Sequence, residues 1–308
     1  MATRRGARKS GASAGPRVAG NAVGATGGTN GAAAATADGP AHRPELSVVI
    51  PAFNSATYID ATVGAVLAFF ASADLDGEVV VADDGSTDGT ADAVRQGANV
   101  RVLRLPHRGK GAAVRAGMQA ARGEFRAFTD ADLPYGTGAL PLAVRYLRER
   151  HYHAVIGDRT LPGSAYEDAG PLRTVLSELA SFVFRTLVTG GIYDTQCGFK
   201  VFRGDVAAEV FRLARIDGFA IDVEVIYLLL KYRLDVKRIP VRLERNAPSS
   251  VHVIRDSVAS VRDIASIRLN LARGRYRSPR LVQLLEDELR ADEDGSAQAR
   301  AKGRKAAL

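Results

Sequence analysis

Two aspartates separated by one residue, Asp130 and Asp132, are the strongest candidates for chemistry in this sequence. They follow an apolar run and precede Pro134 in the stretch EFRAFTDADLP. Two carboxylates this close repel each other unless a cation lies between them, and oxygen ligands suit Mg²⁺ or Mn²⁺ holding a diphosphate. A solvated acidic turn is the simpler alternative. Glycoside hydrolysis is disfavoured, because it needs two carboxyl groups about 5 Å or more apart across a sugar.

A second acidic turn, DDGSTDGT, begins at Asp83 and Asp84, between a predicted strand and a predicted helix. It could carry function, or it could be a turn with a helix cap that satisfies free backbone amides. A calcium loop is excluded, because counting from Asp84 places Arg95 where such a loop needs a bidentate glutamate.

The glycine-rich stretch HRGKGAAVRAG matches neither common nucleotide-binding motif. Val114 stands where a dinucleotide fingerprint needs its third glycine, and Lys110 is followed by Gly111 where a P-loop needs serine or threonine. What remains is a turn that presents Arg108 and Lys110 beside the amides of a helix N-terminus. Such a turn is a reasonable place for an anion.

Four further side chains form a possible phosphate-binding set. Arg159 stands in GDR, Arg173 and Ser177 are four residues apart, and Lys200 lies in DTQCGFKVF. Arginine suits bidentate recognition of phosphate. Taken singly, each of these residues is more often a solvated surface residue.

The single cysteine, Cys197, excludes a disulfide framework and a multi-thiolate metal site. Beside a glycine and a phenylalanine, it is expected to be a small buried side chain rather than a nucleophile. The histidines at 107, 151, 153 and 252 have no metal-ligand spacing, so we interpret them as structural.

Alternating strands and helices must position these polar clusters. The predicted strands are Leu46–Ile50, Glu78–Ala82, Val100–Leu105, a strand ending at Asp130, and Ala154–Arg159; the predicted helices are 56–72, one through Arg95, and 111–121. This alternation predicts an α/β fold with a mostly parallel sheet flanked by helices, and sites at the C-terminal ends of its strands. The acidic clusters and Arg159 fall at such ends.

The net charge of +8 comes from the two ends of the chain. Residues 1–44 and 250–280 carry +5 each and 281–308 carry −1, which leaves −1 on residues 45–249. Nucleic-acid binding would need a basic face interleaved with reading or stacking groups, which neither end obviously supplies, so no nucleic-acid partner is expected. A neutral domain with a basic flank fits an anionic membrane surface.

Composition divides the chain into four parts. They are a disordered Gly/Ala-rich basic tail (1–44), one domain (45–250), a basic amphipathic helical extension (251–280) and a charged tail expected to be disordered (281–308). Amphipathic helices are predicted at Leu172–Val188 and Ile254–Tyr276, and each could lie on a membrane or dock on the domain. No apolar run approaches the 18 residues of a membrane-spanning helix.

Seven blocks in order resemble the family 2 glycosyltransferases, which have the Rossmann-like GT-A fold: SVVIPAFN, VVVADDGSTDGT, RGKGAAVRAGM, FTDADL, IGDR, DTQCGFKVF and GFAIDVEVIYL. The resemblance covers about 45–250 and is greatest to the dolichyl- or polyprenyl-phosphate sugar synthases, particularly the glucosyltransferase branch. It implies inverting transfer of a hexose, with UDP-glucose the first choice, to polyprenyl or dolichyl phosphate, giving a β-linked product. Mannose, N-acetylhexosamine and a soluble or cell-envelope acceptor remain alternatives.

The resemblance also implies Mg²⁺ or Mn²⁺ as cofactor. The basic flank adds the expectation of a peripheral position on the cytoplasmic, inner face of a membrane, and a separate membrane-protein partner is a further possibility. The expected nucleotide-sugar site comprises Pro51, Ala52, Asn54, Asp83, Asp84, Lys110, Asp130 and Ala131. Asp130 and Asp132 are the expected metal ligands; Arg159, Arg173, Ser177 and Lys200 are the expected acceptor-phosphate residues. The expected catalytic residues are Asp132, Arg159 and Arg173.

Three positions depart from the family pattern. Phe53-Asn54-Ser55 replaces a common Tyr-Asn-Glu, Pro134 stands where some mannosyl synthases have a glutamine ligand, and Ser250-Val251 replaces a Ser-Lys pair. His252 or Arg245 could substitute for that missing phosphate contact.

Overall fold

The computed structural model describes residues 43–149, 152–164, 194, 197–244 and 253–291. Within these residues, seven strands form one sheet in the order β3-β2-β1-β4-β6-β5-β7. The strands are β1 (Leu46–Ala52), β2 (Gly77–Asp83), β3 (Val100–Arg104), β4 (Phe125–Phe128), β5 (Ala154–Asp158), β6 (Lys200–Arg203) and β7 (Val236–Pro240). Strands β1 to β4 pair in parallel, as do β5 and β7, whereas β6 is antiparallel to both β4 and β5. The predicted mostly parallel sheet is confirmed.

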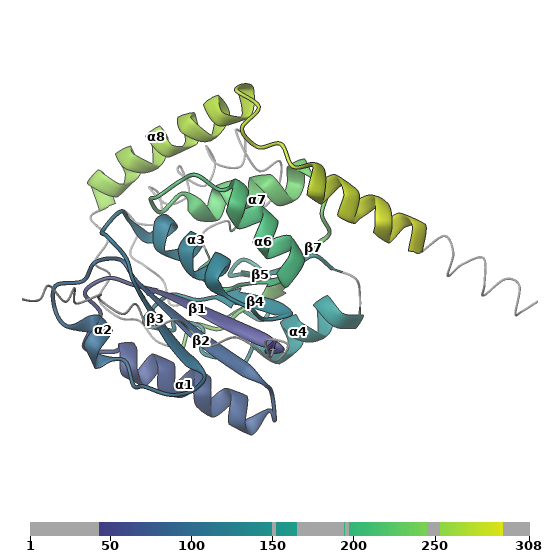
Figure 1. Cartoon of the computed structure of the whole chain (residues 1–308). Helices are drawn as coiled ribbons and strands as arrows, with labels where there is room; N and C mark the ends of the chain where they lie inside the picture. The colour runs from purple at the N-terminus through teal and green to yellow at the C-terminus, as the bar shows by residue number, and fades with distance from the viewer. Residues whose placement is uncertain (1–42, 150–151, 165–193, 195–196, 245–252, 292–308) are drawn as a thin grey trace, which may run out of the picture. The chain divides into compact units, whose positions relative to one another are not determined.

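Helices cover both faces of the sheet (Figure 1). They are α1 (Ile59–Ser72), α2 (Thr90–Ala93), α3 (Lys110–Ala120), α4 (Leu140–Glu149), α6 (Gly204–Leu213), α7 (Ile221–Lys231) and α8 (Val253–Ala272). Alternate residues of β1 enter two separate cores: Val49 packs with α3, α6 and α7, whereas Val48 and Ile50 pack with α1 and α4. Burial on both faces explains why β1 and β2 contain the apolar runs VVI and VVVA rather than an alternation of apolar and polar residues.

The end of α8 and the residues after it join the core formed by α6 and α7. Ile264, Ile267, Tyr276 and Leu281 are all buried in that core. The predicted helix at 254–276 therefore docks on the domain in the part where side chains are described. Ile267 is 1% exposed in that core, whereas Leu271, one turn further along α8, is 37% exposed.

Residues 279–291 form a further helix (Figure 1), so the expectation of disorder from 281 is wrong as far as 291. Leu281 is buried in the core, and Glu288 accepts a hydrogen bond from Nε2 of the buried His153 at 2.8 Å. These contacts compensate for the entropy of ordering the segment. The predicted tail at 1–44 and the predicted helix at 172–188 lie outside the described residues, apart from 43 and 44. In the part of the chain that the structure describes, no helix is long and apolar enough to span a bilayer.

Candidate active site

Asp130 lies in the turn after β4, between a lysine and a glycine from other elements. Nζ of Lys110, the first residue of α3, is 2.7 Å from Oδ1 of Asp130. A Cβ on Gly198 would lie 2.0 Å from Oδ2, so only glycine lets the carboxylate occupy this position. Burial acts to raise the pKa of Asp130, but Lys110, Lys200 and Arg159 outweigh it and hold the pKa below its ordinary value. Asp130 is therefore ionised at neutral pH.

Lys110 also faces a second carboxylate, Asp222, at the start of α7. Its Nζ is 3.6 Å from Oδ2 of Asp222, and Oδ1 of Asp222 accepts a hydrogen bond from Lys200. Lys200 donates a further bond to the Cys197 carbonyl at 2.7 Å. Asp130, Lys110, Asp222 and Lys200 thus form a chain of alternating charges with no net charge.

The position of Lys200 differs from the expectation that it contacts an acceptor phosphate. Its side chain is 1% exposed, and the ammonium lies 5.2 Å from the centre of the Phe128 ring while it pairs with Asp222. The ammonium therefore acts inside the protein, where it holds Asp222 and the segment before β6. Asp222 itself is 3% exposed.

Replacing Asp222 with asparagine is expected to lower the free energy of unfolding by about 3–5 kcal/mol, because the buried ammonium of Lys200 loses its countercharge. Urea unfolding at neutral pH measures the change. Asp92→Asn is the matched control, since it removes an exposed carboxylate that pairs with Arg104 and should cost less than about 1 kcal/mol. An equal decrease in the free energy of unfolding in the two variants would contradict the assignment of a buried ion pair between Lys200 and Asp222.

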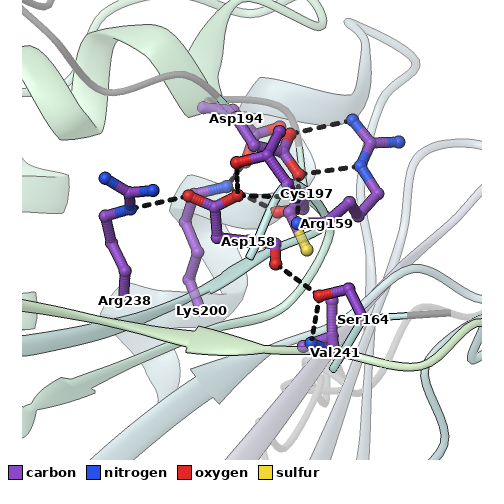
Figure 2. A network of polar contacts seen from close by, with 10 residues as sticks. Asp158, Arg159, Ser164, Asp194, Cys197, Lys200, Arg238 and Val241 are labelled. Carbon is purple, nitrogen blue, oxygen red and sulfur yellow. Dashed lines mark hydrogen bonds and ion pairs between the residues drawn. The ribbon is translucent and has the colours of Figure 1, made fainter. Parts of the chain in front are cut away.

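Arg159, directly after β5, is fixed by Asp194 (Figure 2). The carboxylate of Asp194 accepts from the Arg159 backbone amide at 2.9 Å and from Nε and Nη2 at 2.8 Å each. Asp194 is 6% exposed, whereas a third of the Arg159 side chain is open to solvent. This bidentate geometry sets the direction of the guanidinium at the rim of the site.

A second buried pair supports the turn that carries Arg159. Asp158 is fully buried and accepts from Nε of Arg238 at 2.6 Å and from the Thr160 amide at 2.8 Å. Its carbonyl accepts from the Ser164 hydroxyl at 2.8 Å (Figure 2). The backbone on both sides of Arg159 is therefore held by buried polar contacts.

The Asp194 pair predicts a specific loss of stability in acid. Burial acts to raise the pKa of Asp194, but Arg159 outweighs it and lowers the pKa below its model-peptide value. A lowered folded-state pKa contributes stability above the unfolded pKa of about 3.9, and this is lost as the pH falls through the folded value. As the pH is lowered from about 6 to 2, the free energy of unfolding measured with urea should therefore fall less for Asp194→Asn than for the wild type. Parallel curves would contradict this.

Asp84 anchors the glycine-rich turn before α3. Its carboxylate accepts from the backbone amides of Arg108 and Gly109 at 2.8 Å each, and Nδ1 of His107 lies 2.8 Å from Oδ2. Asp84 is 2% exposed. Asp84 thus holds the turn that precedes Lys110, and its contact with a nucleotide stays a prediction.

The other expected nucleotide-side residues gather around the ends of β1 and β2. Pro51 and Ala52 are buried at the end of β1, and Asp83 accepts from the Ser86 amide at 3.4 Å. Asn54 adopts a left-handed conformation with a φ of 49°, and its Oδ1 accepts from the Thr87 amide at 3.0 Å. These contacts fix the turn after β2 against the turn after β1.

Sequence reasoning missed His107, which it interpreted as structural. The His107 ring stacks on Phe53 with centroids 4.2 Å apart, and 45% of Phe53 is exposed. The pair presents a flat aromatic surface beside Asp84. Asp194 and Asp222 were also missed as site residues, although both lie within the blocks that carry the family resemblance.

Cys197 matches its expected role as a small buried side chain. It is 1% exposed, and burial raises the pKa of its thiol to about 11. A Cβ on Gly157 would lie 2.7 Å from its sulfur, which indicates tight packing. A protonated, enclosed thiol is a poor nucleophile.

The remaining predicted residues divide into those near Asp130 and those outside the described part of the chain. The carbonyl of Ala131 accepts from the Thr62 hydroxyl at 2.7 Å, which ties the turn to α1, and Asp132 is half-buried in the same turn. Arg173 and Ser177 lie outside the described residues, as do the possible substitutes Arg245 and His252.

The turn after β4 fits a divalent cation that is shared with a substrate. Among the residues that the structure describes, no group of three or more His, Cys, Asp or Glu side chains could hold a metal ion by itself. Mg²⁺ is usually held by one or two carboxylates and completes its shell with substrate phosphates and water. Asp130, which is ionised and 32% exposed, would supply one such carboxylate and Asp132 the other.

Comparison with known proteins places the chain among glycosyltransferases. The profile of "Glycosyl transferase family 2" matches residues 47–211. Among curated proteins, the dolichyl-phosphate beta-glucosyltransferase of Dictyostelium discoideum is 29% identical over 251 residues, covering 74% of this chain and 75% of the relative. The enzyme of the same name from Drosophila melanogaster is 34% identical over 219 residues, covering 64% of this chain and 66% of the relative. The one from Homo sapiens is 28% identical over 254 residues, covering 76% of this chain and 78% of the relative.

Solved structures share the fold at lower sequence identity. Mannosyl-3-phosphoglycerate synthase from Rubrobacter xylanophilus has a TM-score of 0.50 and 19% identity, covering 77% of this chain and 78% of that chain. Glucosyl-3-phosphoglycerate synthase from Mycobacterium tuberculosis, in complex with uridine diphosphate, has a TM-score of 0.51 and 20% identity, covering 73% and 80%. Since the family profile spans more than half of the chain, this protein belongs to glycosyl transferase family 2.

Proposed function

We propose that this enzyme transfers glucose from UDP-glucose to the phosphate of a polyprenol of the dolichyl type, with inversion to a β-linked product. The observation that carries the proposal is the pairing of ionised Asp130 with Lys110 beside a strand end that presents Arg159 in a fixed direction. The names of the relatives from Dictyostelium, Drosophila and human support this donor sugar and acceptor.

The chemistry of the acceptor explains why this site needs no strong general base. A phosphate monoester is already an anion at neutral pH, so transfer depends on positioning and on stabilising charge. Lys110 would bind the donor diphosphate, and Arg159 would orient the acceptor phosphate in the direction that Asp194 sets. Asp130 and Asp132 would hold Mg²⁺ or Mn²⁺, which supplies positive charge for the departing nucleoside diphosphate.

A lipid acceptor also gives the basic extension a role. Arg268 and Leu269 are exposed on α8, and Arg273 and Arg275 follow it with exposed side chains. Basic and apolar groups on one segment favour contact with an anionic lipid surface. We therefore propose that the enzyme lies peripherally on the cytoplasmic face of a membrane, where a membrane-protein partner could assist.

An assay of nucleoside diphosphate release tests this function. The purified protein is incubated with Mg²⁺ or Mn²⁺ and a panel of UDP- and GDP-sugars, with and without polyprenyl phosphate, and Asp132→Ala is the control. Lipid-dependent release from UDP-glucose, abolished in the variant, is expected. Release at the same rate with and without polyprenyl phosphate would indicate a soluble acceptor. A preference for another nucleotide sugar would indicate that mannose or an N-acetylhexosamine, rather than glucose, is transferred.

A further inference from the structure

Glu224 of α7 joins the basic extension (251–280), called the C-terminal extension below, to residues 215–218, the segment that precedes α7. Its side chain is fully buried. Oε2 accepts from the backbone amides of Arg215 and Ile216 at 2.9 Å each. Oε1 accepts from the hydroxyl of Tyr276, which follows α8. One carboxylate therefore connects two parts of the chain that are about 60 residues apart in sequence.

The segment next to these amides supports the N-terminus of α3, where Lys110 stands. The carbonyl of Asp217 accepts from the amides of Gly111 at 2.7 Å and Ala112 at 3.2 Å. Its carboxylate pairs with Arg108 at 2.7 Å and with Arg115 at 2.5 Å. A Cβ on Gly111 would lie 2.5 Å from a carbonyl of this segment, so the two backbones are in direct contact. A displacement of residues 215–218 would therefore move Lys110.

Tyr276 is held firmly enough to act as an anchor. It is fully buried, and its carbonyl accepts from the Tyr232 hydroxyl at 2.8 Å, which in turn accepts from the Ser278 amide at 2.6 Å. The extension meets the same segment a second time through α8, because a Cβ on Gly218 would lie 2.7 Å from the carboxylate of Asp263. Two separate contacts thus converge on the segment that supports Lys110.

We propose that Tyr276 is a positioning residue of the donor site: through Glu224 and residues 215–218 it fixes the start of α3, so that the C-terminal extension is part of the nucleotide-sugar site. The ligand named here rests on the proposed function, whereas the coupling rests on the contacts alone. Tyr276 lies outside residues 47–211, the part that matches the family profile. A buried carboxylate that loses one donor is left partly unsatisfied, which costs free energy and weakens the network that holds its remaining partners.

Tyr276→Phe tests the coupling, because it removes the hydroxyl and keeps the ring that fills the core. Calorimetric titration should give a Kd for UDP about tenfold higher than in the wild type, which corresponds to the loss of one hydrogen bond to a charged group. Steady-state kinetics should give a raised KM for UDP-glucose with kcat and the acceptor KM unchanged. Without any ligand, the amides of Gly111 and Ala112 should exchange with solvent faster.

Tyr146→Phe is the control, since this half-buried tyrosine belongs to α4 and packs against the other core. It should leave UDP binding and the exchange of these amides unchanged. Glu224→Gln should reproduce the effects of Tyr276→Phe, and the double variant should be no worse than the more affected single variant. Additive effects would overturn the proposal.

Unchanged exchange at Gly111 and Ala112 in Tyr276→Phe would also overturn it, even if the variant unfolds at a lower temperature. Failure of the proposed function looks different. In that case the wild type itself does not bind UDP, and amide exchange in the ligand-free protein still decides whether Tyr276 holds the start of α3.

Discussion

Replacing Asp130 with asparagine is expected to lower kcat/KM for sugar transfer by about a thousandfold, a loss of about 4 kcal/mol of transition-state stabilisation. The substitution preserves the size of the side chain but removes the negative charge. Lys110 then loses its partner at 2.7 Å and keeps Asp222, 3.6 Å away, so its ammonium shifts toward α7. The site thus loses a cation ligand and misplaces a diphosphate-binding group together. The nucleoside diphosphate release assay measures the effect.

Asp92→Asn is the control for this experiment, because it makes the same change on the exposed surface of α2. It should retain full activity. Circular dichroism and urea unfolding should show that Asp130→Asn remains folded, since Lys110 still has one carboxylate partner. Activity of Asp130→Asn within tenfold of the wild type would contradict the role assigned to this carboxylate.

The second large effect is expected for Arg159→Lys, which keeps the positive charge but loses the planar fork. Lysine cannot make the two parallel bonds that Nε and Nη2 of Arg159 make to Asp194, so the charge is no longer held in one direction. We expect kcat/KM for the lipid acceptor to fall about a hundredfold, whereas the KM for UDP-glucose changes less than about threefold. Kinetics with each substrate varied in turn separates the two parameters.

Arg238→Lys provides the matched comparison. Arg238 of β7 pairs with the buried carboxylate of Asp158 at the end of the neighbouring strand β5 (Figure 2). Asp158 directly precedes Arg159 in the sequence, but Arg159 itself pairs with a different carboxylate, that of Asp194. Its replacement should lower the stability to urea without a selective loss for the acceptor. If Arg159→Lys raises the donor KM and leaves acceptor kinetics unchanged, Arg159 belongs to the donor side and the proposed arrangement is wrong.

The order of strands and helices was predictable because β1, β2 and β5 each contain a short apolar run, such as VVI in β1 and VVVA in β2. Strands β1, β2, β3 and β5 were found within two residues of their predicted ends. The strand expected to end at Asp130 stops at Phe128, which leaves both aspartates in the following turn. The helix expected through Arg95 ends at Ala93, since Val94 is already extended. Local pattern therefore locates elements well and their ends less well.

Contacts between distant segments were not predictable from local pattern. The antiparallel β6 is determined by its neighbours on both sides rather than by its own four residues. Lysine is usually a solvated surface residue, yet the fold encloses Lys200 beside Asp222. The partnership of Arg159 with Asp194 likewise joins positions 35 residues apart. These contacts depend on the tertiary fold, which brings side chains together without leaving a periodic signal in the sequence.

The most direct test of the proposed reaction is the identity of the product. The enzyme is incubated with polyprenyl phosphate and UDP-glucose labelled with ¹³C at the anomeric carbon, and the lipid fraction is examined by NMR. We predict a glucosyl phosphate on the polyprenol with the β configuration, formed by the wild type and absent with Asp130→Asn. An α-linked lipid product, or label that appears as free glucose or on a soluble acceptor, would contradict the account.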